Sequence, residues 1–147
     1  MLPIVTKLHP AAAGAVAALV WAALEPLDQR FFRCDYSDVA ILGKAVTRGS
    51  ASRAVGLGVH AGNGALFGLA YDALRKRVDG DERRLALGMA LAEHVALWPL
   101  TYLVDRFHPA RGERGLPPLA TNGRAFGQAT LRHAVFGVVL GRLSRPG

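Results

Sequence analysis

The chain has 147 residues, of which 51% are hydrophobic, and it carries a formal net charge of +7. This length is that of one domain, and this apolar share is high for a soluble protein of the same size. The single cysteine, Cys34, excludes an internal disulfide and any paired-cysteine motif for metal or haem attachment. We therefore predict one domain over residues 1–147.

The apolar residues are concentrated in four runs, and nearly all of the charge lies between them. Each run is close to the roughly 20 residues that a helix needs to cross the hydrocarbon core of a bilayer. The alternative is a soluble helical bundle, but the second and third runs lack the polar face at helical period that such a bundle shows. We predict an all-α, antiparallel four-helix transmembrane bundle with spans at residues 11–27, 54–74, 85–104 and 125–143.

The first run follows Lys7, and Pro10 suits the first position of a helix because its missing N–H has no partner to lose there. A short basic start and an alanine-rich core are also typical of secretory signals. Because three more runs follow, and no small-x-small cleavage site comes after Trp21, we predict a retained first helix. Pro26 should stop or bend this helix, since the residue before a proline is pushed out of the α region.

The longest connection joins the first two runs, and its middle, DVAILGKAV, fits either a short interfacial helix or a strand. The third run contains Pro99, which should leave the carbonyl of Val95 without its helical partner and bend the helix there. Pro109 should end the third helix. Before the fourth run, Thr121 or Asn122 is the expected N-cap.

Glycines recur at a spacing of four in the second and fourth runs. This Gly-x-x-x-Gly spacing lets two membrane helices approach backbone to backbone. We predict from it that the second and fourth helices pack closely, and homo-oligomerisation through such faces is a further expectation. The glycines concerned are Gly58, Gly62, Gly64, Gly68, Gly137 and Gly141.

Polar residues inside the runs gather in the half of the bundle nearer the two longer loops. Counting about 1.5 Å of rise per residue places Glu93 and His94 deepest, near the middle of the membrane. Charged groups at such depth need a partner, so we expect Arg132 to meet Glu93 or Glu25. The predicted polar cluster consists of Glu25, His60, Asn63, Glu93, His94, Gln128, Arg132 and His133.

Three functions are compatible with this cluster. The leading expectation is a small structural or accessory membrane protein, in which the cluster is a buried network of ion pairs and hydrogen bonds. The second is a conduit for protons or a small solute, because imidazoles titrate near neutral pH and chains of acids and histidines relay protons. The third is a metal or haem site formed by His60, His94, His133 and Glu93, since imidazole and carboxylate bind zinc or iron. No cofactor is predicted.

No motif indicates an enzyme, because the chain lacks Gly-x-Ser-x-Gly, a phosphate-binding Gly-x-x-x-x-Gly-Lys loop and His-Glu-x-x-His. The densest basic segment, RKRVDGDERR at 75–84, has no aromatic residue on which a base could stack, so nucleic acid is not an expected partner. Its charge suits anionic lipid headgroups. Five Lys and Arg residues in this short loop favour its side, which also holds both termini, as the cytoplasmic one.

Several residues recur at matching places in a known group of proteins: Trp21, Glu25, Pro26 and Leu27 at the end of the first helix, His60 in the second, Trp98, Pro99 and Leu100 in the third, and His133 in the fourth. In these features the chain resembles small bacterial inner-membrane proteins of the YagU type. The spacing between the Trp, Glu and Pro differs, and the loop after the first helix is shorter here. The resemblance implies a topology and an inner-membrane location, and it implies no chemistry.

Overall fold

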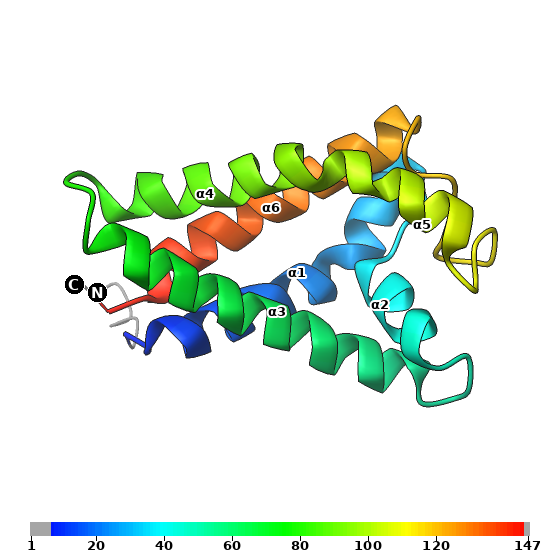
Figure 1. Ribbon diagram of the computed structural model, residues 1–147, viewed down its shortest axis with the longest axis horizontal. Helices are drawn as coiled ribbons and strands as arrows, with labels where there is room; N and C mark the ends of the chain where they lie inside the picture. Colours follow the sequence, from blue (N-terminus) through cyan, green and yellow to red (C-terminus); the bar gives the residue numbers. More distant parts are fainter. Residues whose placement is uncertain (1–6, 146–147) are drawn as a thin grey trace.

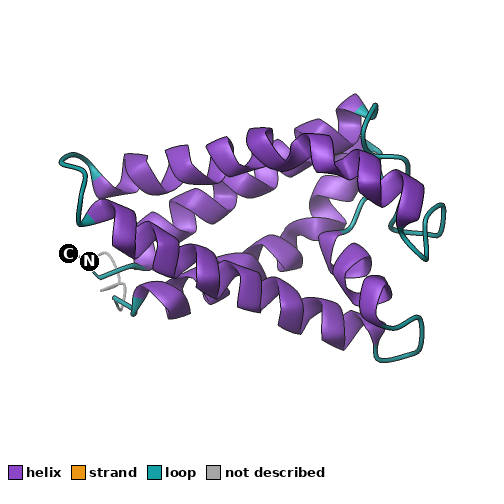
Figure 2. Cartoon of the chain, viewed as in Figure 1, coloured by secondary structure: helices purple, strands orange, loops and turns teal. Residues whose placement is uncertain are grey.

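The computed structural model describes residues 7–145, and every regular element in them is helical (Figures 1 and 2). Apart from helices, this part of the chain has one isolated parallel bridge, between Leu8 and Ser144. The prediction of an all-α fold is confirmed. In chain order the elements are α1 (Pro10–Phe32), α2 (Asp38–Val46), α3 (Ser52–Arg75), α4 (Glu82–Leu97), the 3-10 turn η1 (Trp98–Leu100), α5 (Thr101–Phe107) and α6 (Gly123–Leu143).

The long helices run up and down the long axis of the molecule, as Figure 1 shows. The start of α1, the end of α6 and the connection from α3 to α4 lie at one end of the molecule, and the two longer connections lie at the other. Hydrogen bonds hold the first end together. Lys7 Nζ donates to the carbonyl of Arg142 at 2.7 Å, and Arg75 Nη1 donates to the carbonyl of Arg145 at 2.6 Å.

Two helical segments are long and apolar enough to cross a membrane. They are α1 and the continuous segment Glu82–Phe107, which joins α4, η1 and α5. The predicted spans 54–74 and 125–143 form helices of sufficient length, α3 and α6, but these do not reach the same apolarity. The four-span prediction is therefore supported for its first and third spans. Glycine and the polar residues of α3 and α6 account for the difference.

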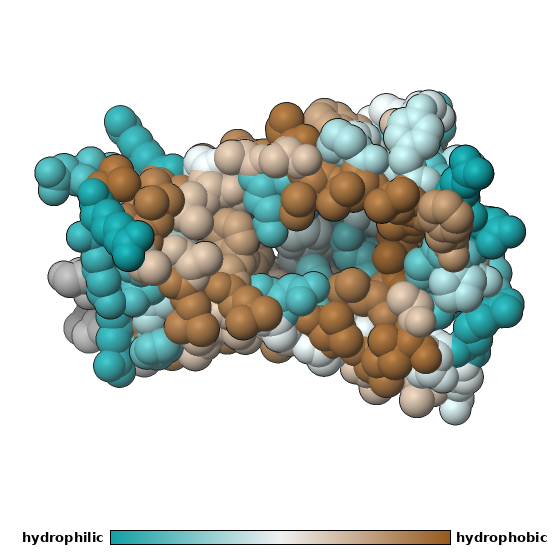
Figure 3. Space-filling view, viewed as in Figure 1, coloured by the Kyte–Doolittle hydropathy of each residue, from teal (hydrophilic) through white to brown (hydrophobic). Residues whose placement is uncertain are grey.

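The surface between the two ends of the molecule is largely apolar. In Figure 3, hydrophobic residues dominate the middle of the visible face, and hydrophilic residues gather at both ends. Large apolar side chains are exposed on several helices, among them Leu66 on α3, Val95 on α4 and Leu103 on α5. An exposed apolar surface of this extent is unfavourable in water and is expected where a protein meets lipid or another protein.

Glycines let α1 and α3 cross with their backbones in contact. A Cβ atom added to Gly14 would lie 2.0 Å from the carbonyl oxygen of Gly64, and one added to Gly68 would lie 2.1 Å from that of Pro10. No side chain fits at such distances. The close crossing therefore depends on glycine at these positions.

The predicted close packing of the second helix on the fourth is wrong. The second predicted helix, α3, packs on α1 and α2, whereas the fourth, α6, packs on α4 and α1. A Cβ atom on Gly137 would lie 2.7 Å from Leu87 Cα of α4, and one on Gly141 would lie 3.1 Å from Arg83 Cα. Gly58 and Gly62 face open space. Glycine spacing permits a close approach, but it does not determine which helix approaches.

Several predictions concern the ends of the helices. α1 begins at Pro10, and Asn122 caps α6, accepting hydrogen bonds from two backbone N–H groups at 3.1 and 3.2 Å. Of the two effects predicted for Pro26, a stop or a bend, the stop does not occur, because α1 continues to Phe32 and ends at Arg33 in the left-handed conformation (φ 51°). A proline inside a helix removes one hydrogen bond, and buried contacts of the following turn hold the helix together here.

The middle of the connection after α1, which fits either a helix or a strand by sequence, is a helix. The long helix that contains Pro99 changes to a 3-10 turn at that proline. DVAILGKAV forms α2, which Ser37 caps by accepting a hydrogen bond from the Ala40 N–H at 3.0 Å. Pro99 lies in η1, where the Thr101 hydroxyl donates to the carbonyl of Trp98 at 2.6 Å. The helix in which the sequence predicts a bend thus contains a 3-10 turn between α4 and α5.

Candidate functional site

Arg132 is the centre of a buried ionic network. Its side chain is 1% exposed, and its Nε and Nη2 atoms donate to the two carboxylate oxygens of Asp28, each at 2.6 Å. Nη1 donates to Asp38 at 2.8 Å, and Nη2 also donates to the carbonyl of Tyr36 at 3.0 Å. The guanidinium lies over the Tyr36 ring, 4.9 Å from its centroid. A charge can be buried when its partners satisfy it in this way.

Gln128 and Glu25 complete the network. Gln128 Nε2 donates to Asp28 at 2.6 Å. Glu25 lies 3.7 Å from Arg132 Nη1, and its carboxylate accepts hydrogen bonds from the Ser37 hydroxyl at 2.6 Å and from a backbone N–H of α2. The expected pairing of Arg132 with Glu93 or Glu25 is therefore confirmed for Glu25 and not for Glu93. Asp28 and Asp38, which the prediction lacks, lie closer to Arg132 and are its main partners.

The predicted cluster lacks Asp28, Asp38 and Tyr36. A signal for Asp28 is present in the sequence, because it follows Glu25 by three residues and therefore shares its helix face. The predicted helix end at Pro26 concealed this signal. Asp38 and Tyr36 have no such signal, since they lie in a connection whose path depends on the rest of the fold.

Asp38 joins the network to the aromatic residues beside it. Its Oδ2 accepts a hydrogen bond from Trp21 Nε1 at 3.1 Å as well as from Arg132, and its Oδ1 accepts one from the Tyr36 hydroxyl. Burial, together with the neighbouring Asp38 carboxylate, raises the pKa of Tyr36 well above its ordinary value. Tyr36 is therefore a neutral donor, and the position of Trp21 depends on the ion pairs behind it.

Two of the three predicted histidines contact Trp21, and the third, His94, contacts one of those two. The Trp21 indole contacts both His60 and His133, with ring centroids 4.9 and 4.5 Å apart, and His94 stacks on His133 at 4.7 Å. Within residues 7–145, no group of three or more His, Cys, Asp or Glu side chains is placed to hold a metal ion. This arrangement does not support the metal or haem site considered from the sequence.

His94 is almost fully buried, and its Nε2 has a partner on α6. It is 3% exposed, and its Nε2 lies 2.9 Å from the Thr130 hydroxyl oxygen. That hydroxyl donates its own hydrogen to the carbonyl of Phe126 at 2.8 Å. His94 must therefore be the donor to Thr130, and both of these polar groups serve to join α4 to α6.

A cavity of about 330 Å³ lies between α3 and α4. Figure 3 shows the hollow in the middle of the molecule, with both hydrophobic and hydrophilic residues around its mouth. Its lining includes the aromatic residues Trp21, Tyr36, Phe67 and Phe136 and the polar residues Asp38, His60, Asn63, Glu93 and His133. Four residues of the predicted cluster, His60, Asn63, Glu93 and His133, thus meet here. The other four, Glu25, His94, Gln128 and Arg132, lie in the packing around it.

Comparisons with protein-family models, curated proteins and solved structures find no match for this chain. The resemblance to proteins of the YagU type therefore stays a prediction. Any functional conclusion rests on the chemistry of the cavity.

The imidazoles in the cavity wall present hydrogen-bond acceptors. His60 is 7% exposed, and its Nε2 is buried without a partner among the described residues. In the tautomer that carries its proton on Nδ1, toward the carbonyl of Ala18, Nε2 holds a free lone pair. The imidazole of His133 also has a backbone partner on the Nδ1 side, because its Nδ1 lies 2.8 Å from the carbonyl oxygen of Ala129. Its Nε2 lies 3.9 Å from the carboxylate of Glu93.

Proposed function

We propose that the chain is a small integral membrane protein that binds an amphipathic ligand in the cavity between α3 and α4. The head of this ligand carries an amine, an ammonium or a hydroxyl group. The observation that carries the proposal is the buried, unpartnered Nε2 of His60 in the wall of a cavity that also contains Glu93. Buried polar atoms in native proteins nearly always have a partner, so one without any points to a ligand or ordered water.

The apolar surface supports a membrane location. Large apolar side chains are exposed along the helices, and charge gathers at both ends of the molecule. Leu97 and Leu100, which line the cavity, are themselves exposed. A ligand would therefore enter sideways, from the lipid. We place the chain in a bacterial inner membrane with both termini and the 75–84 loop in the cytoplasm, because five basic residues lie in that short loop.

The charges around the cavity select the chemistry of the ligand. Glu93 is 42% exposed, and within residues 7–145 no Lys or Arg forms an ion pair with it. Arg132 is buried behind the cavity wall, where Asp28, Asp38 and Tyr36 occupy its N–H groups. The cavity therefore offers acceptors and negative charge without a free cation, and this favours donor heads over carboxylates.

The size and the aromatic wall fit the same ligand class. Binding pockets for small molecules range from about 300 to 1,000 Å³, so about 330 Å³ accommodates a head group and the first part of a chain. Trp21 and Phe67 line the cavity, and the faces of aromatic rings attract cations. The Arg132 network supports this wall, because Asp38 binds Arg132 and Trp21 at once.

A conduit for protons is less well supported. Such a path requires continuous access to water, whereas Arg132 and His94 are almost fully buried and hydrogen-bonded. Their role as a structural network agrees with the leading expectation from the sequence. The open polar space is confined to the cavity.

Fluorescence of Trp21 tests the proposal. The chain has two tryptophans, so the variant W98F leaves Trp21, in the cavity wall, as the reporter. In phosphatidylcholine nanodiscs, we expect dodecylamine to change this emission saturably and dodecanoate to leave it unchanged. E93Q in the W98F background should weaken amine binding about tenfold, equivalent to ~1.4 kcal/mol.

The control is E113Q, which removes the same charge from a residue outside the cavity lining. It should bind the amine like the parent, and circular dichroism should show the same helix content in all variants. Equal binding of dodecylamine and dodecanoate would contradict the proposal. Unchanged amine affinity in both E93Q and H60L would contradict it as well.

A further inference from the structure

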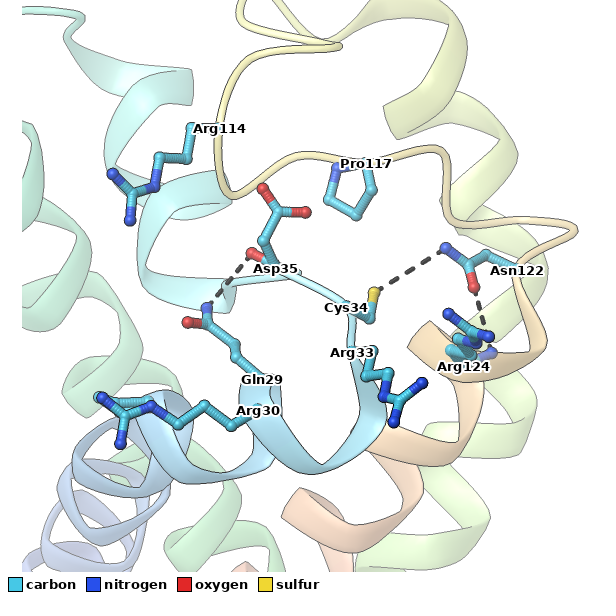
Figure 4. A pocket seen from close by; sticks show the side chains of 10 residues that line it. Gln29, Arg30, Arg33, Cys34, Asp35, Arg114, Pro117, Asn122 and Arg124 are labelled. Carbon is cyan, nitrogen blue, oxygen red and sulfur yellow. Dashed lines mark hydrogen bonds between the residues drawn. The ribbon is translucent and has the colours of Figure 1, made fainter.

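A second hollow, of about 760 Å³, lies at the end of the molecule formed by the longer connections (Figure 4). Its walls come from the end of α1, from the connection between α5 and α6, and from the start of α6. Asp35 is the one acid among the residues that line it. The basic residues lining it are Arg30, Arg33, Arg114 and Arg124.

None of these four guanidinium groups forms an ion pair within residues 7–145. Other basic residues at this end are compensated, because Lys44 and Arg48 both pair with Glu113. Asp35 is already engaged, since its Oδ2 accepts a hydrogen bond from the Gly115 N–H at 3.0 Å. The hollow therefore has a marked excess of unpaired positive charge.

Arg30 and Arg124 lie in α1 and α6, whereas Arg33 follows α1 and Arg114 lies in the connection between α5 and α6. Figure 4 shows Arg33 and Arg124 on one side of the hollow and Arg30 and Arg114 on the other. Cys34 is buried between them, and Asn122 Nδ2 donates to its sulfur at 3.9 Å, which links the end of α1 to the start of α6. The positive end of the α6 dipole lies at the same place and adds to the attraction for an anion.

The opposite end of the molecule is less suited to anions than its sequence indicates. In the basic segment 75–84, Arg75 pairs with Asp72 at 2.6 Å and with Glu82 at 3.1 Å. Lys76 pairs with Asp72 at 2.7 Å. Much of the basic charge there is thus neutralised within the chain, whereas the four arginines of the hollow are free.

We propose that this hollow binds the phosphate of an anionic phospholipid headgroup. The proposal rests on the membrane location in the proposed function. Guanidinium groups bind phosphate through paired N–H donors, and these contacts are among the strong hydrogen bonds in proteins. Exposed Leu27 and Phe31 lie close to Arg30 in α1, and exposed Phe126 follows Arg124 in α6. Apolar surface for acyl chains therefore adjoins the phosphate site.

Lipid retention measured by native mass spectrometry tests this site. The full chain is purified in mixed micelles that contain equal amounts of phosphatidylglycerol and phosphatidylcholine. We expect the wild type to retain phosphatidylglycerol preferentially. In R33A/R124A, the ratio of retained phosphatidylglycerol to retained phosphatidylcholine should fall at least about tenfold. R77A/R83A is the matched control, because it removes two exposed arginines from the opposite end. R33K/R124K keeps the charge and should keep part of the preference.

Equal retention of phosphatidylglycerol by wild type and by folded R33A/R124A would overturn the proposal, as would an equal loss in R77A/R83A. Glycerol phosphate is titrated separately in neutral micelles. If it binds as tightly as phosphatidylglycerol, the site binds a free phosphate, and the proposal of a lipid ligand is overturned. Selective lipid retention with no dodecylamine binding would support this site while contradicting the function proposed for the cavity.

Discussion

The guanidinium of Arg132 and the carboxylate of Asp28 form an ion pair through two hydrogen bonds, each 2.6 Å long, in the interior of the bundle. The two residues are 104 positions apart in the chain and join α6 to α1. Both side chains are almost fully buried. If either partner is removed, the other becomes a buried charge without compensation, which is far more costly than the loss of an exposed ion pair.

Replacing Arg132 should therefore destabilise the protein strongly. We expect R132L to lower the free energy of unfolding by about 3–5 kcal/mol, because Asp28 and Asp38 lose their shared cation. Unfolding in mixed micelles, followed by circular dichroism, measures this loss. R142L, which replaces an exposed arginine of the same helix, should change the free energy by less than about 0.5 kcal/mol. Equal effects of the two substitutions would contradict the assigned role of the ion pair.

The two acids of α1 should respond differently to loss of charge. Asp28 accepts three hydrogen bonds, two from Arg132 and one from Gln128, so D28N should cost about 3 kcal/mol. Glu25 accepts from the Ser37 hydroxyl, which can reorient toward an amide, so E25Q should cost only about 1 kcal/mol. The same unfolding measurement compares them. A larger loss in E25Q than in D28N would reverse this ranking.

Glycine substitutions should separate contact glycines from open ones. G14A and G64A place a methyl group against the backbone of the facing helix and should force α1 and α3 apart, with a marked loss of thermal stability. G58A and G62A meet nothing and should be neutral or stabilising by up to about 1 kcal/mol, because alanine favours helix over glycine. Thermal unfolding of the four variants tests this. Destabilisation by G58A would indicate a contact, such as one in an oligomer, at that face.

Glu113 should make one contact at the longer-loop end sensitive to acid. Hydrogen bonds and charge from Lys44 and Arg48 hold the pKa of Glu113 below its ordinary value. A lowered pKa in the folded state means that the stabilisation is present above the ordinary glutamate pKa of about 4.3 and is lost as the pH falls through the lowered value. E113Q should therefore flatten the decline in melting temperature on acidification. An unchanged pH profile in E113Q would show that the contact adds nothing.

Cysteine labelling tests the proposed orientation. With Cys34 replaced by alanine, D79C reports on the connection between α3 and α4, and R111C reports on the connection between α5 and α6. In intact spheroplasts, a membrane-impermeant maleimide should label R111C and spare D79C, because the 75–84 loop is proposed to be cytoplasmic. Labelling of D79C alone would show that the chain has the opposite orientation in the membrane. Labelling of both after lysis serves as the control.

Local patterns in the sequence account for the helices, and they also indicate part of the site. Pro10 and Asn122 mark helix starts, and Pro99 marks the interruption between α4 and α5. His60 and Asn63, which the sequence assigns to one polar cluster, line the same cavity. These features follow from backbone geometry and helical period, which act over a few residues and are therefore visible in the sequence.

From the sequence alone follow the four long helices, the position of the 75–84 loop at the same end as the start of the first helix and the end of the fourth, and the concentration of polar residues on a few helix faces. The continuation of α1 past Pro26, the pairing of Asp28 and Asp38 with Arg132, and the packing of α3 on α1 are visible only in the folded chain. These three features depend on contacts between segments that are distant in the chain. A glycine face or a buried charge restricts which partners are possible, but it does not select one of them. The cavity beside His60 and the hollow lined by arginines arise from that selection.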